Sequence, residues 1–361
     1  MSLLKLDIHH VRNILKESIH PSPGINFIVG NNASGKSSLL EAIYILGRAK
    51  SFRSTSIKPV IHFGESHLIV SAQVLQSDGC NLQVGIQLDG TNTDIRINQQ
   101  THQQKSDLAY ILPIQLIHPK SYELLDGGAQ LRREFLDWGV FNDDKSFLTA
   151  WRNYKRAISH RNALLKIKQS NLLHIWDKEV VYYGTIVNKS RCDYLQKFKP
   201  IFFEIIKHFL QLSFIDIEFI SGWSLGQNFE DVLRRDVEKD LRYGFTHSGP
   251  HRCDFLLKLD NRLARDFVSR GQLKLIVLGL KLAQIQLLTR GNTNQPCILI
   301  DDFAAELDND FRKNLLGFLS SLSCQTFITT NEFCDFGDLN KISNFNVFHM
   351  EHGHIRPCLG F

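Results

Sequence analysis

A glycine-rich stretch near the N-terminus combines residue types that could hold phosphate groups. It reads Gly30-Asn31-Asn32-Ala33-Ser34-Gly35-Lys36-Ser37, which matches the pattern G-x-x-x-x-G-K-[ST]. Glycines let the backbone curl so that its N–H groups point inward at phosphate oxygens. The ammonium of Lys36 would contact the β- and γ-phosphates of a nucleotide, and the hydroxyl of Ser37 would ligate Mg²⁺.

The residues on either side of this stretch supply the elements that such a loop requires. An apolar run, Ile25–Val29, predicts a strand that leads into the loop, and the spacing of apolar residues over 37–46 predicts a helix that leaves it. The positive N-terminal end of that helix would face the anion. We therefore predict nucleotide binding, the alternative being a glycine-rich strand-to-helix turn without a ligand.

Two carboxylates follow a second apolar run, Cys297–Ile300. The run is typical of a strand that is buried on both faces. Asp301 would hold the Mg²⁺ shell opposite Ser37, and Asp302 would orient or deprotonate the attacking water at the γ-phosphate. Without a nucleotide, the two residues would only be exposed acids at the end of a strand.

A second possible anion site precedes the helix predicted at 271–290. Its residues are Ser269-Arg270-Gly271-Gln272, and a serine and a glycine at a helix N-terminus can bind an anion with the help of the helix dipole. Two phosphate-binding ends lie far apart in this sequence. Two chains arranged head to tail, with ATP between them, would explain both. An ordinary N-cap is the alternative.

These motifs, in this order, resemble the ATP-binding-cassette heads of the SMC class, and more narrowly the RecF family. Ala305–Asp308, just after the acidic strand, belongs to the same resemblance. Further stretches that carry it are Val11–Asn13, Ser51–Ser54, Leu112–Ile117, Arg132–Trp138 and Gly249–Arg252. The likeness runs nearly end to end. Transporter cassettes lack the central block, and true SMC proteins have much longer coiled coils.

The resemblance implies an ATPase that acts as a switch on DNA. ATP binding would drive dimerisation near single-strand/double-strand junctions at gaps, and slow hydrolysis would release the dimer. The implied partners are RecR, with RecO in the same pathway, to load RecA onto gapped DNA coated with single-strand-binding protein. The implied roles are gap repair, restart of stalled replication forks and SOS induction.

The resemblance also implies which residues contact the nucleotide. Residues Gly30–Ser38 would form the nucleotide loop. Ser269, Gly271 and Gln272 would cap the γ-phosphate of the neighbouring chain. Asp301 matches the acid that is associated with Mg²⁺.

Three further residues would take part in hydrolysis or in its control. Asp302 stands where cassette ATPases usually carry Glu, and its shorter side chain agrees with slow turnover. Gln115 resembles the switch glutamine that links Mg²⁺ to the helical lobe. Arg53 resembles an arginine that can reach the phosphates in cis. The expected catalytic residues are therefore Asp302, Lys36 and Arg53.

Three residues depart from the family's pattern. Ala33 replaces a common glycine, so the loop must tolerate a Cβ there. Ala305 replaces the usual serine after the acidic strand, which bears on one contact across the dimer. Val11 replaces a usual phenylalanine, which we interpret as a packing change.

A basic block occupies the middle of the chain. Residues 145–199 contain twelve Lys or Arg and three acids, a net +9, whereas the whole chain has a net +5. Neutralising phosphates would give affinity for DNA of any sequence, and no recognition-helix motif indicates base readout. We predict DNA contact here, with Lys155, Arg156 and Arg161 as candidates. A solvated helical face is the alternative.

Composition excludes several classes of protein. The chain has 361 residues, of which 43% are hydrophobic and 22% charged, so it is not disordered, collagen-like or a small disulfide scaffold. Its seven cysteines include no C-x-x-C pair, which indicates reduced thiols. We predict that the longest apolar-rich run, Leu273–Leu288, is too short and too polar to span a bilayer, and residues 1–10 do not form a signal peptide. We expect a cytoplasmic protein without a membrane partner.

The order of the predicted elements indicates an α/β fold, an ATPase head of the ABC/SMC type with an inserted, mostly helical lobe. Residues 1–118 would form the N-terminal part of the ATPase domain, 119–238 the lobe, and 239–361 the C-terminal part with the 269–272 turn and the acidic strand. Alternating apolar and polar residues over 68–97 predict antiparallel strands.

Two other functional classes stay open at this point. A transporter-class cassette ATPase would serve a protein or membrane partner and would not bind DNA. A P-loop small-molecule kinase would not need the 269–272 turn, and a nuclease-linked ATPase would need another acidic metal cluster. A kinase can work as a monomer, whereas the preferred interpretation needs a nucleotide-dependent dimer.

Overall fold

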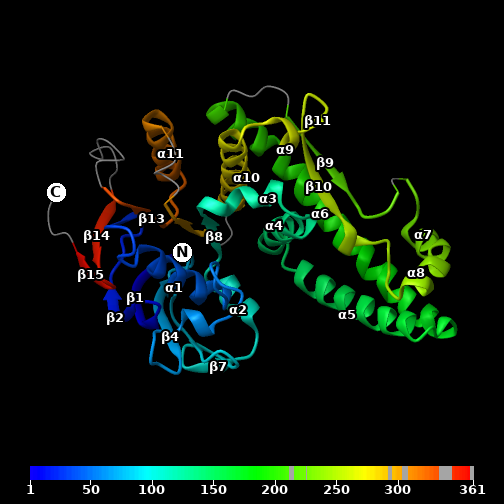
Figure 1. Ribbon diagram of the computed structural model, residues 1–361, viewed down its shortest axis with the longest axis horizontal. Coiled ribbons are helices and arrows are strands. Elements are labelled where there is room, and N and C mark those ends of the chain that lie inside the picture. Colours follow the sequence, from blue (N-terminus) through cyan, green and yellow to red (C-terminus); the bar gives the residue numbers. More distant parts are fainter. Residues whose placement is uncertain (211–214, 225, 292–294, 303–307, 333–343, 358–361) are drawn as a thin grey trace. The chain divides into compact units, whose positions relative to one another are not determined.

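The computed structural model describes residues 1–210, 215–224, 226–291, 295–302, 308–332 and 344–357. The chain divides into two compact units. One, which we call the sheet unit, comprises residues 1–120 and 288–361. The other, the helical unit, comprises residues 121–287. The architecture is α/β with an inserted, mostly helical part, as predicted (Figure 1).

The second boundary of the insertion differs from the predicted one. The first lies at 120/121, close to the predicted 118/119, but the second lies at 287/288 instead of 238/239. Strand β9 (Ile215–Ile220) pairs with β10 (Asp254–Leu259). In helix α10 (Arg270–Arg290), Gln284 Nε2 donates a hydrogen bond of 2.8 Å to the carbonyl oxygen of Phe135. These long-range contacts hold residues 239–287 in the helical unit, although the sequence of this segment predicts strands and a helix like those of the sheet unit.

A mainly parallel sheet forms one layer of the sheet unit, in the order β15-β14-β3-β13-β12-β8. Its strands are β3 (Ile25–Val29), β8 (Ile114–Ile117), β12 (Cys297–Ile300), β13 (Thr326–Thr330), β14 (Phe345–Glu351) and β15 (His354–Pro357). Strands β3, β8, β12, β13 and β14 run parallel, and β15 is antiparallel to β14. The carboxyl ends of parallel strands share one edge of a sheet. The residues that follow β3, β12 and β13 therefore meet at that edge.

An antiparallel sheet forms the other layer of the sheet unit, in the order β2-β1-β4-β5-β6-β7. Its strands are β1 (Ser2–Val11), β2 (Ile14–Ile19), β4 (Leu68–Leu75), β5 (Asn81–Leu88), β6 (Thr93–Ile97) and β7 (Gln100–His102). The predicted antiparallel strands over 68–97 are confirmed by the pairing of β4 with β5 and of β5 with β6. Alternate residues of these strands are buried, as period-two patterning requires.

Helix α1 (Lys36–Arg48) joins the two sheets through one hydrophobic core. Its buried residues Leu39, Leu40 and Ile43 belong to the same cluster as Val70 of β4 and Leu299 of β12. Among its described residues, the sheet unit has four further helices: η1 (Lys58–Val60), α2 (Lys105–Ile111), η2 (Pro119–Tyr122), which crosses the boundary, and α11 (Asn309–Ser321). Helix α1 thus starts at the phosphate-type loop and is fixed along its length.

The helical unit is built around a long pair of helices, α5 (Phe147–Lys166) and α6 (Leu173–Leu210), which pack along each other (Figure 1). A three-stranded sheet, β11-β10-β9, accompanies them, with β11 at Arg262–Leu263. Further helices in the described part of this unit are α3 (Glu123–Asp126), α4 (Ala129–Asp143), η3 (Ser170–Leu172), α7 (Phe229–Arg235), α8 (Val237–Tyr243), η4 (Pro250–Arg252) and α9 (Ala264–Phe267).

Helix α10 spans Arg270–Arg290 and is therefore longer than the apolar-rich run Leu273–Leu288. With 21 residues it is long and apolar enough, by length and composition alone, to cross a membrane, so the prediction that the run is too short and polar does not hold for the whole helix. Most of its apolar window is nevertheless buried inside the protein, as in the core helix of a globular domain. Ile276, Val277 and Leu280 are fully buried examples.

The side chain of Gln325 links the two sheets of the sheet unit. It accepts a hydrogen bond of 2.7 Å from the backbone N–H of Leu3 and donates to the carbonyl oxygens of Leu3 at 2.9 Å and of Ser22 at 2.8 Å. Gln325 immediately precedes β13 and is buried. Its amide therefore binds both backbone groups of Leu3 in β1 of the other layer, and it shares the carbonyl oxygen of Ser22, between β2 and β3, with the side chain of Asn26.

Replacing Gln325 should destabilise the sheet unit. We expect Gln325→Leu to lower the free energy of unfolding by about 2–4 kcal/mol, because buried polar groups that lose their partner cost roughly 1–3 kcal/mol each. Urea unfolding, followed by circular dichroism, measures the effect. The matched control is Gln83→Leu on an exposed position of β5, which should change stability by less than about 0.5 kcal/mol. Equal midpoints for the two variants would contradict the assigned role.

Candidate nucleotide-binding site

The glycine-rich loop connects β3 to α1, as the sequence predicted. A Cβ at Gly30 would overlap the carbonyl oxygen of Met350, so no larger residue fits there. Gly35 is the N-cap of α1 and has φ 116°, a conformation that favours glycine. Ala33 has φ 64°, so it adopts the left-handed conformation in spite of its Cβ. The loop is therefore wound as a phosphate-binding loop must be, with strain at Ala33.

Lys36 lies at the start of α1 with its side chain folded back over the loop. Its ammonium donates to the carbonyl oxygens of Gly30 at 2.7 Å and of Asn31 at 3.1 Å, and to Oδ1 of Asn331 at 2.9 Å. Asn331 follows the carboxyl end of β13, and sequence reasoning missed it. The signal that could have found it is the run Thr326–Thr330, whose β-branched and aromatic residues are typical of a strand, because residues after parallel strands gather at one edge.

Ser37 and Asp301 meet at the same edge, as predicted. The Ser37 hydroxyl donates to Asp301 Oδ1 at 2.9 Å, and the Thr329 hydroxyl donates to the same oxygen at 3.0 Å. Burial raises the pKa of the Asp301 carboxyl, and the hydrogen bonds from Ser37 and Thr329 oppose that rise. A hydroxyl beside a buried carboxylate is a set of oxygen donors that suits Mg²⁺.

Asp302 lies beside this pair and faces the adjoining cavity. Its backbone N–H donates to the Thr329 hydroxyl at 2.8 Å, and its φ of 46° is left-handed. Both carboxylates lie within reach of the Thr329 hydroxyl, at 3.0 Å for Asp301 Oδ1 and 3.4 Å for Asp302 Oδ1, and Asp301 also accepts from Ser37 whereas Asp302 lines the cavity. The expected Ala305 contact lies outside the described residues.

A buried carboxylate, Glu41, holds two arginines at the wall of the cavity. Arg12 donates to it through Nε at 2.8 Å and Nη2 at 3.0 Å, and Arg53 lies 3.8 Å from it. The Ser51 hydroxyl donates to Glu41 and accepts from the backbone N–H of Arg53. Glu41 is fully buried, whereas Arg53 is half exposed. One carboxylate against two guanidinium groups leaves net positive charge where phosphates would bind.

The loop, the arginines and Asp302 line one cavity of about 1030 Å³. This volume is at the upper end of the usual range for small-molecule sites. Ser34, which is buried, has a hydroxyl without a hydrogen-bond partner in the described structure. Asn13 lines the cavity too; its Nδ2 donates to the Ser34 carbonyl at 3.1 Å and its Oδ1 accepts from Ser38 at 2.9 Å. The residues present therefore fit a bound nucleoside triphosphate.

Gln115 is not at the position that its expected role requires. It lies within β8, is buried, and stands in register with Ile298, three residues before Asp301. At about 3.3 Å per residue, that places it roughly 10 Å from the carboxyl edge. It is absent from the described residues that line the cavity. The prediction that Gln115 links Mg²⁺ to the helical lobe is therefore wrong for this structure; His118 follows β8 at the level of Asp301.

The turn at 269–272 forms a capping box at the start of α10. Gln272 N–H donates to the Ser269 hydroxyl at 3.2 Å, and Ser269 N–H donates to Oε1 of Gln272 at 3.0 Å. All four residues are exposed. A Cβ at Gly271 would meet only the Ser269 hydroxyl, at 3.9 Å, so the chain's own packing does not require glycine there.

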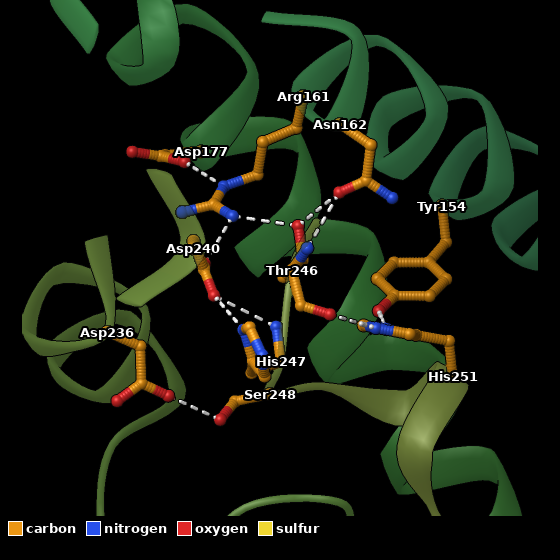
Figure 2. A network of polar contacts seen from close by, with 10 residues as sticks. All are labelled: Tyr154, Arg161, Asn162, Asp177, Asp236, Asp240, Thr246, His247, Ser248 and His251. Atoms are coloured by element: carbon orange, nitrogen blue, oxygen red, sulfur yellow. Dashed lines mark hydrogen bonds and ion pairs between the residues drawn. The ribbon is translucent and has the colours of Figure 1, made fainter. Parts of the chain in front are cut away.

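The predicted DNA contact Arg161 is an internal residue. Its side chain is fully buried, and it donates through Nε to Asp177 at 2.7 Å and through Nη1 to Asp240 at 2.6 Å and to the Thr246 hydroxyl at 2.7 Å (Figure 2). The prediction that Arg161 contacts DNA is therefore wrong. In a helix rich in basic residues, the sequence does not distinguish a buried basic residue from the exposed ones. The other two candidates, Lys155 and Arg156, are exposed.

The same network continues through two histidines (Figure 2). His247 donates through its backbone N–H to Asp240 at 3.0 Å, and its Nδ1 lies 2.8 Å from that carboxylate. The Tyr154 hydroxyl lies 2.6 Å from His251 Nδ1, and His251 Nε2 lies 3.0 Å from the Thr246 carbonyl oxygen. A neutral His251 that donates from Nε2 satisfies both contacts. No cluster of three metal-ligating side chains occurs among the described residues.

Five cysteines fall within the described residues and form no disulfide there, namely Cys80, Cys192, Cys253, Cys297 and Cys324. Cys334 and Cys358 lie outside them. The thiols of Cys253, Cys297 and Cys324 are buried, and burial raises the pKa of each. These three are therefore protonated packing residues.

Several known proteins resemble this chain in sequence over nearly its whole length. Residues 2–355 match the family model described as RecF/RecN/SMC N terminal domain. The DNA replication and repair protein RecF of Vibrio vulnificus (strain CMCP6) is 40% identical over 359 residues, which cover 98% of this chain and 99% of that protein. The protein of the same name from Marinomonas sp. (strain MWYL1) is 42% identical over 338 residues, covering 92% and 91%.

Solved structures agree with the sequence relatives. The structure of the recombination mediator protein RecF-ATPrS in the RecFOR pathway aligns with a TM-score of 0.86 and 26% identity, covering 99% of this chain and 98% of that one. The Smc head domain from Pyrococcus furiosus, bound to the C-terminal domain of ScpA, aligns with a TM-score of 0.58 and 15% identity over 98% and 95%. The second likeness concerns the fold alone.

The buried His251 should make stability depend on pH. Burial lowers the pKa of His251 from 6.5 to about 4, helped by the charges of Arg252 and Arg133. Between these values the unfolded chain binds more protons than the folded one, so stability is full above pH 6.5 and falls as pH drops toward 4. When the pH is lowered from 7.5 to 5, protonation of this one group should reduce the free energy of unfolding by about 2 kcal/mol.

Chemical unfolding of the wild type and of His251→Gln at the two pH values tests this. All other groups titrate in both proteins, so the difference between their pH dependences isolates His251. At pH 7.5, His251→Gln should have a lower free energy of unfolding than the wild type. At pH 5, the difference between the two proteins should be smaller by about 2 kcal/mol. Parallel pH profiles would show that His251 is not held neutral by its surroundings.

Proposed function

The chain belongs to the RecF family, and from that premise we propose that it is an ATP-dependent DNA-binding protein of recombinational gap repair and replication restart. The observation that carries the proposal is the meeting of Lys36, Ser37 and Asp301 at one edge of the parallel sheet. A chain that matches RecF proteins over nearly their whole length supplies the biological context. Support for SOS induction belongs to the same proposal.

ATP would bind in the cavity above the loop, and Mg²⁺ would be held by Ser37 and Asp301. The metal would supply positive charge that offsets the charge of the phosphates. Lys36 already donates to three oxygen acceptors, so its ammonium is placed to exchange them for phosphate oxygens. Residues Gly30–Ser38 would surround the phosphates with backbone N–H groups and hydroxyls.

Hydrolysis would rest on Asp302, Lys36 and Arg53. Asp302 lines the cavity and would orient or deprotonate the attacking water. Arg53 would stabilise charge on the phosphates in cis, and Glu41 restrains it together with Arg12. The short side chain of Asp302 gives less reach than glutamate would, which supports a weak ATPase that is used as a switch.

The turn at 269–272 would complete the site of a second chain. Gly271 stands at the exposed second position of α10, and the packing of the described residues does not require glycine there. An approaching phosphate would require it, because a side chain at Gly271 would hinder contact with backbone N–H groups. Ser269 and Gln272 would exchange their mutual hydrogen bonds for the γ-phosphate. We therefore infer an ATP-dependent homodimer that hydrolysis releases.

The partners follow from the family. The dimer would bind gapped DNA near single-strand/double-strand junctions, and RecR, with RecO in the same pathway, would help it to load RecA. A related solved structure is described as a recombination mediator of the RecFOR pathway. The site of action would be the cytoplasm, and no membrane partner is proposed.

Fluorescence anisotropy on gapped DNA tests the proposal. The wild type should bind at least tenfold more tightly with ATP and Mg²⁺ than with ADP or without nucleotide. Lys36→Ala should abolish that gain, because it removes the cation that binds the phosphates. Lys16→Ala, on an exposed position of β2, is the matched control and should keep the gain.

Two results would contradict the proposal. Negligible DNA affinity in every nucleotide state would favour an ABC-type ATPase subunit that serves a protein or membrane partner. If ATP strengthened DNA binding by Lys36→Ala as much as by the wild type, the loop at 30–37 would not be the site through which ATP acts.

A further inference from the structure

Two hairpin turns of the sheet unit contact the glycine-rich loop at 30–37. The turn Arg12–Asn13 joins β1 to β2, and the turn His352–Gly353 joins β14 to β15. Nδ1 of His354 in β15 lies 2.9 Å from Oε1 of Glu17 in β2, so the two hairpins lie side by side. One turn comes from the beginning of the chain and the other from near its end.

Both turns donate a hydrogen bond to the same carbonyl oxygen of the loop, that of Ser34. The side chain of Asn13 donates through Nδ2 at 3.1 Å, and the backbone N–H of Gly353 donates at 2.8 Å. Two donors occupy both lone pairs of this oxygen. The Oδ1 atom of Asn13 also accepts from the Ser38 hydroxyl at 2.9 Å, which ties the loop to the first turn of α1.

The direction of the Ser34 carbonyl determines the direction of the next N–H group, that of Gly35. The peptide bond between them is trans, and in a trans peptide the C=O and N–H bonds point opposite ways. The N–H of Gly35 therefore points away from Gly353. It has no hydrogen-bond acceptor in the part of the chain that the structure describes, and Gly35 lines the cavity. The two donors thus keep one N–H group available for a phosphate oxygen.

Only glycine fits the second turn at position 353. Gly353 has φ 85°, and a Cβ there would lie 2.2 Å from the carbonyl oxygen of Asn13. A backbone oxygen does not move aside as the end of a flexible side chain does. A larger residue would therefore separate the two turns and withdraw the N–H of Gly353 from Ser34.

The strand before this turn supports the loop at two of its glycines. A Cβ at Gly30 would lie 2.3 Å from the carbonyl oxygen of Met350, and a Cβ at Gly35 would lie 2.7 Å from Cε of Met350. The loop is thus in close contact with β14 at both ends. Its shape depends on a hairpin near the other end of the chain, as well as on its own sequence.

We propose that Asn13 and Gly353 are positioning residues for nucleotide binding, which hold the Ser34 peptide so that the N–H of Gly35 faces the phosphates. The inference rests on the proposed function, because it concerns the same loop. Both residues act through the Ser34 carbonyl. Without the two donors, this peptide is free to rotate, and its carbonyl oxygen would repel the phosphates when it turned toward them.

The test compares Gly353→Ala, Asn13→Ala and the double variant with the control Gly79→Ala. Gly79 lies in the loop between β4 and β5 and also has φ 85°, but a Cβ there would meet no described heavy atom within 4 Å. The control therefore carries the same backbone strain without the contact. Circular dichroism and urea unfolding without nucleotide verify that each variant is folded. Calorimetric titration with ATP and Mg²⁺, and separately with inorganic tripolyphosphate, measures affinity.

Gly353→Ala and Asn13→Ala should each bind ATP and tripolyphosphate about tenfold more weakly than the wild type. The double variant should be at most about threefold weaker than either single variant, because both changes act on one carbonyl. Gly79→Ala should stay within about twofold of the wild type. If Gly353→Ala does not fold, Asn13→Ala decides, and its loss should be equal for ATP and tripolyphosphate.

Four results would overturn the inference. They are wild-type affinity in a folded Gly353→Ala or Asn13→Ala variant, losses that multiply in the double variant, a loss confined to ATP, and an equal loss in Gly79→Ala. Each of them leaves the proposed function intact as long as the wild type binds ATP. A wild type that binds neither ATP nor tripolyphosphate would overturn the proposed function, and this inference with it.

Discussion

The buried carboxylate of Asp301 is the constraint on which the candidate site depends. A carboxylate at the carboxyl end of a buried strand loses hydration, which raises the pKa of Asp301, and hydrogen-bond donors or a cation oppose that rise. Here two hydroxyls, from Ser37 of α1 and Thr329 of β13, donate to the same oxygen. That one atom therefore fixes three elements relative to one another. The loop before α1 and the ammonium of Lys36 take their positions from this arrangement.

Arginine serves opposite purposes in the two units. In the helical unit, Arg161 and Arg191 are buried against aspartates and hold helices together. In the sheet unit, Arg53 is half exposed and is only restrained by the buried Glu41. The paired arginines keep their charge inside, whereas the restrained one presents charge to a ligand.

Sequence alone predicted the parts of the site that depend on local spacing. The loop at 30–37 and the strand before Asp301 were found because glycines, a lysine and an apolar run follow fixed rules, and the α/β fold with its helical insertion is confirmed. Gln115 and Arg161 were assigned wrongly because spacing does not show depth within a strand or burial of a charge. Glu41 and Asn331 were missed because their partners lie far away in sequence. The boundary at 287/288 escaped prediction for the same reason.

Sedimentation velocity in the presence of Mg²⁺ tests the central claim, that ATP joins two chains through the loop of one and the 269–272 turn of the other. The account predicts a monomer without nucleotide and with ADP, and a dimer with ATP. It also predicts that Gly271→Val stays monomeric with ATP, although it folds and binds the nucleotide, because space around Gly271 accommodates a side chain. A mass that does not respond to nucleotide, or an unimpaired ATP-dependent dimer of Gly271→Val, would contradict the claim.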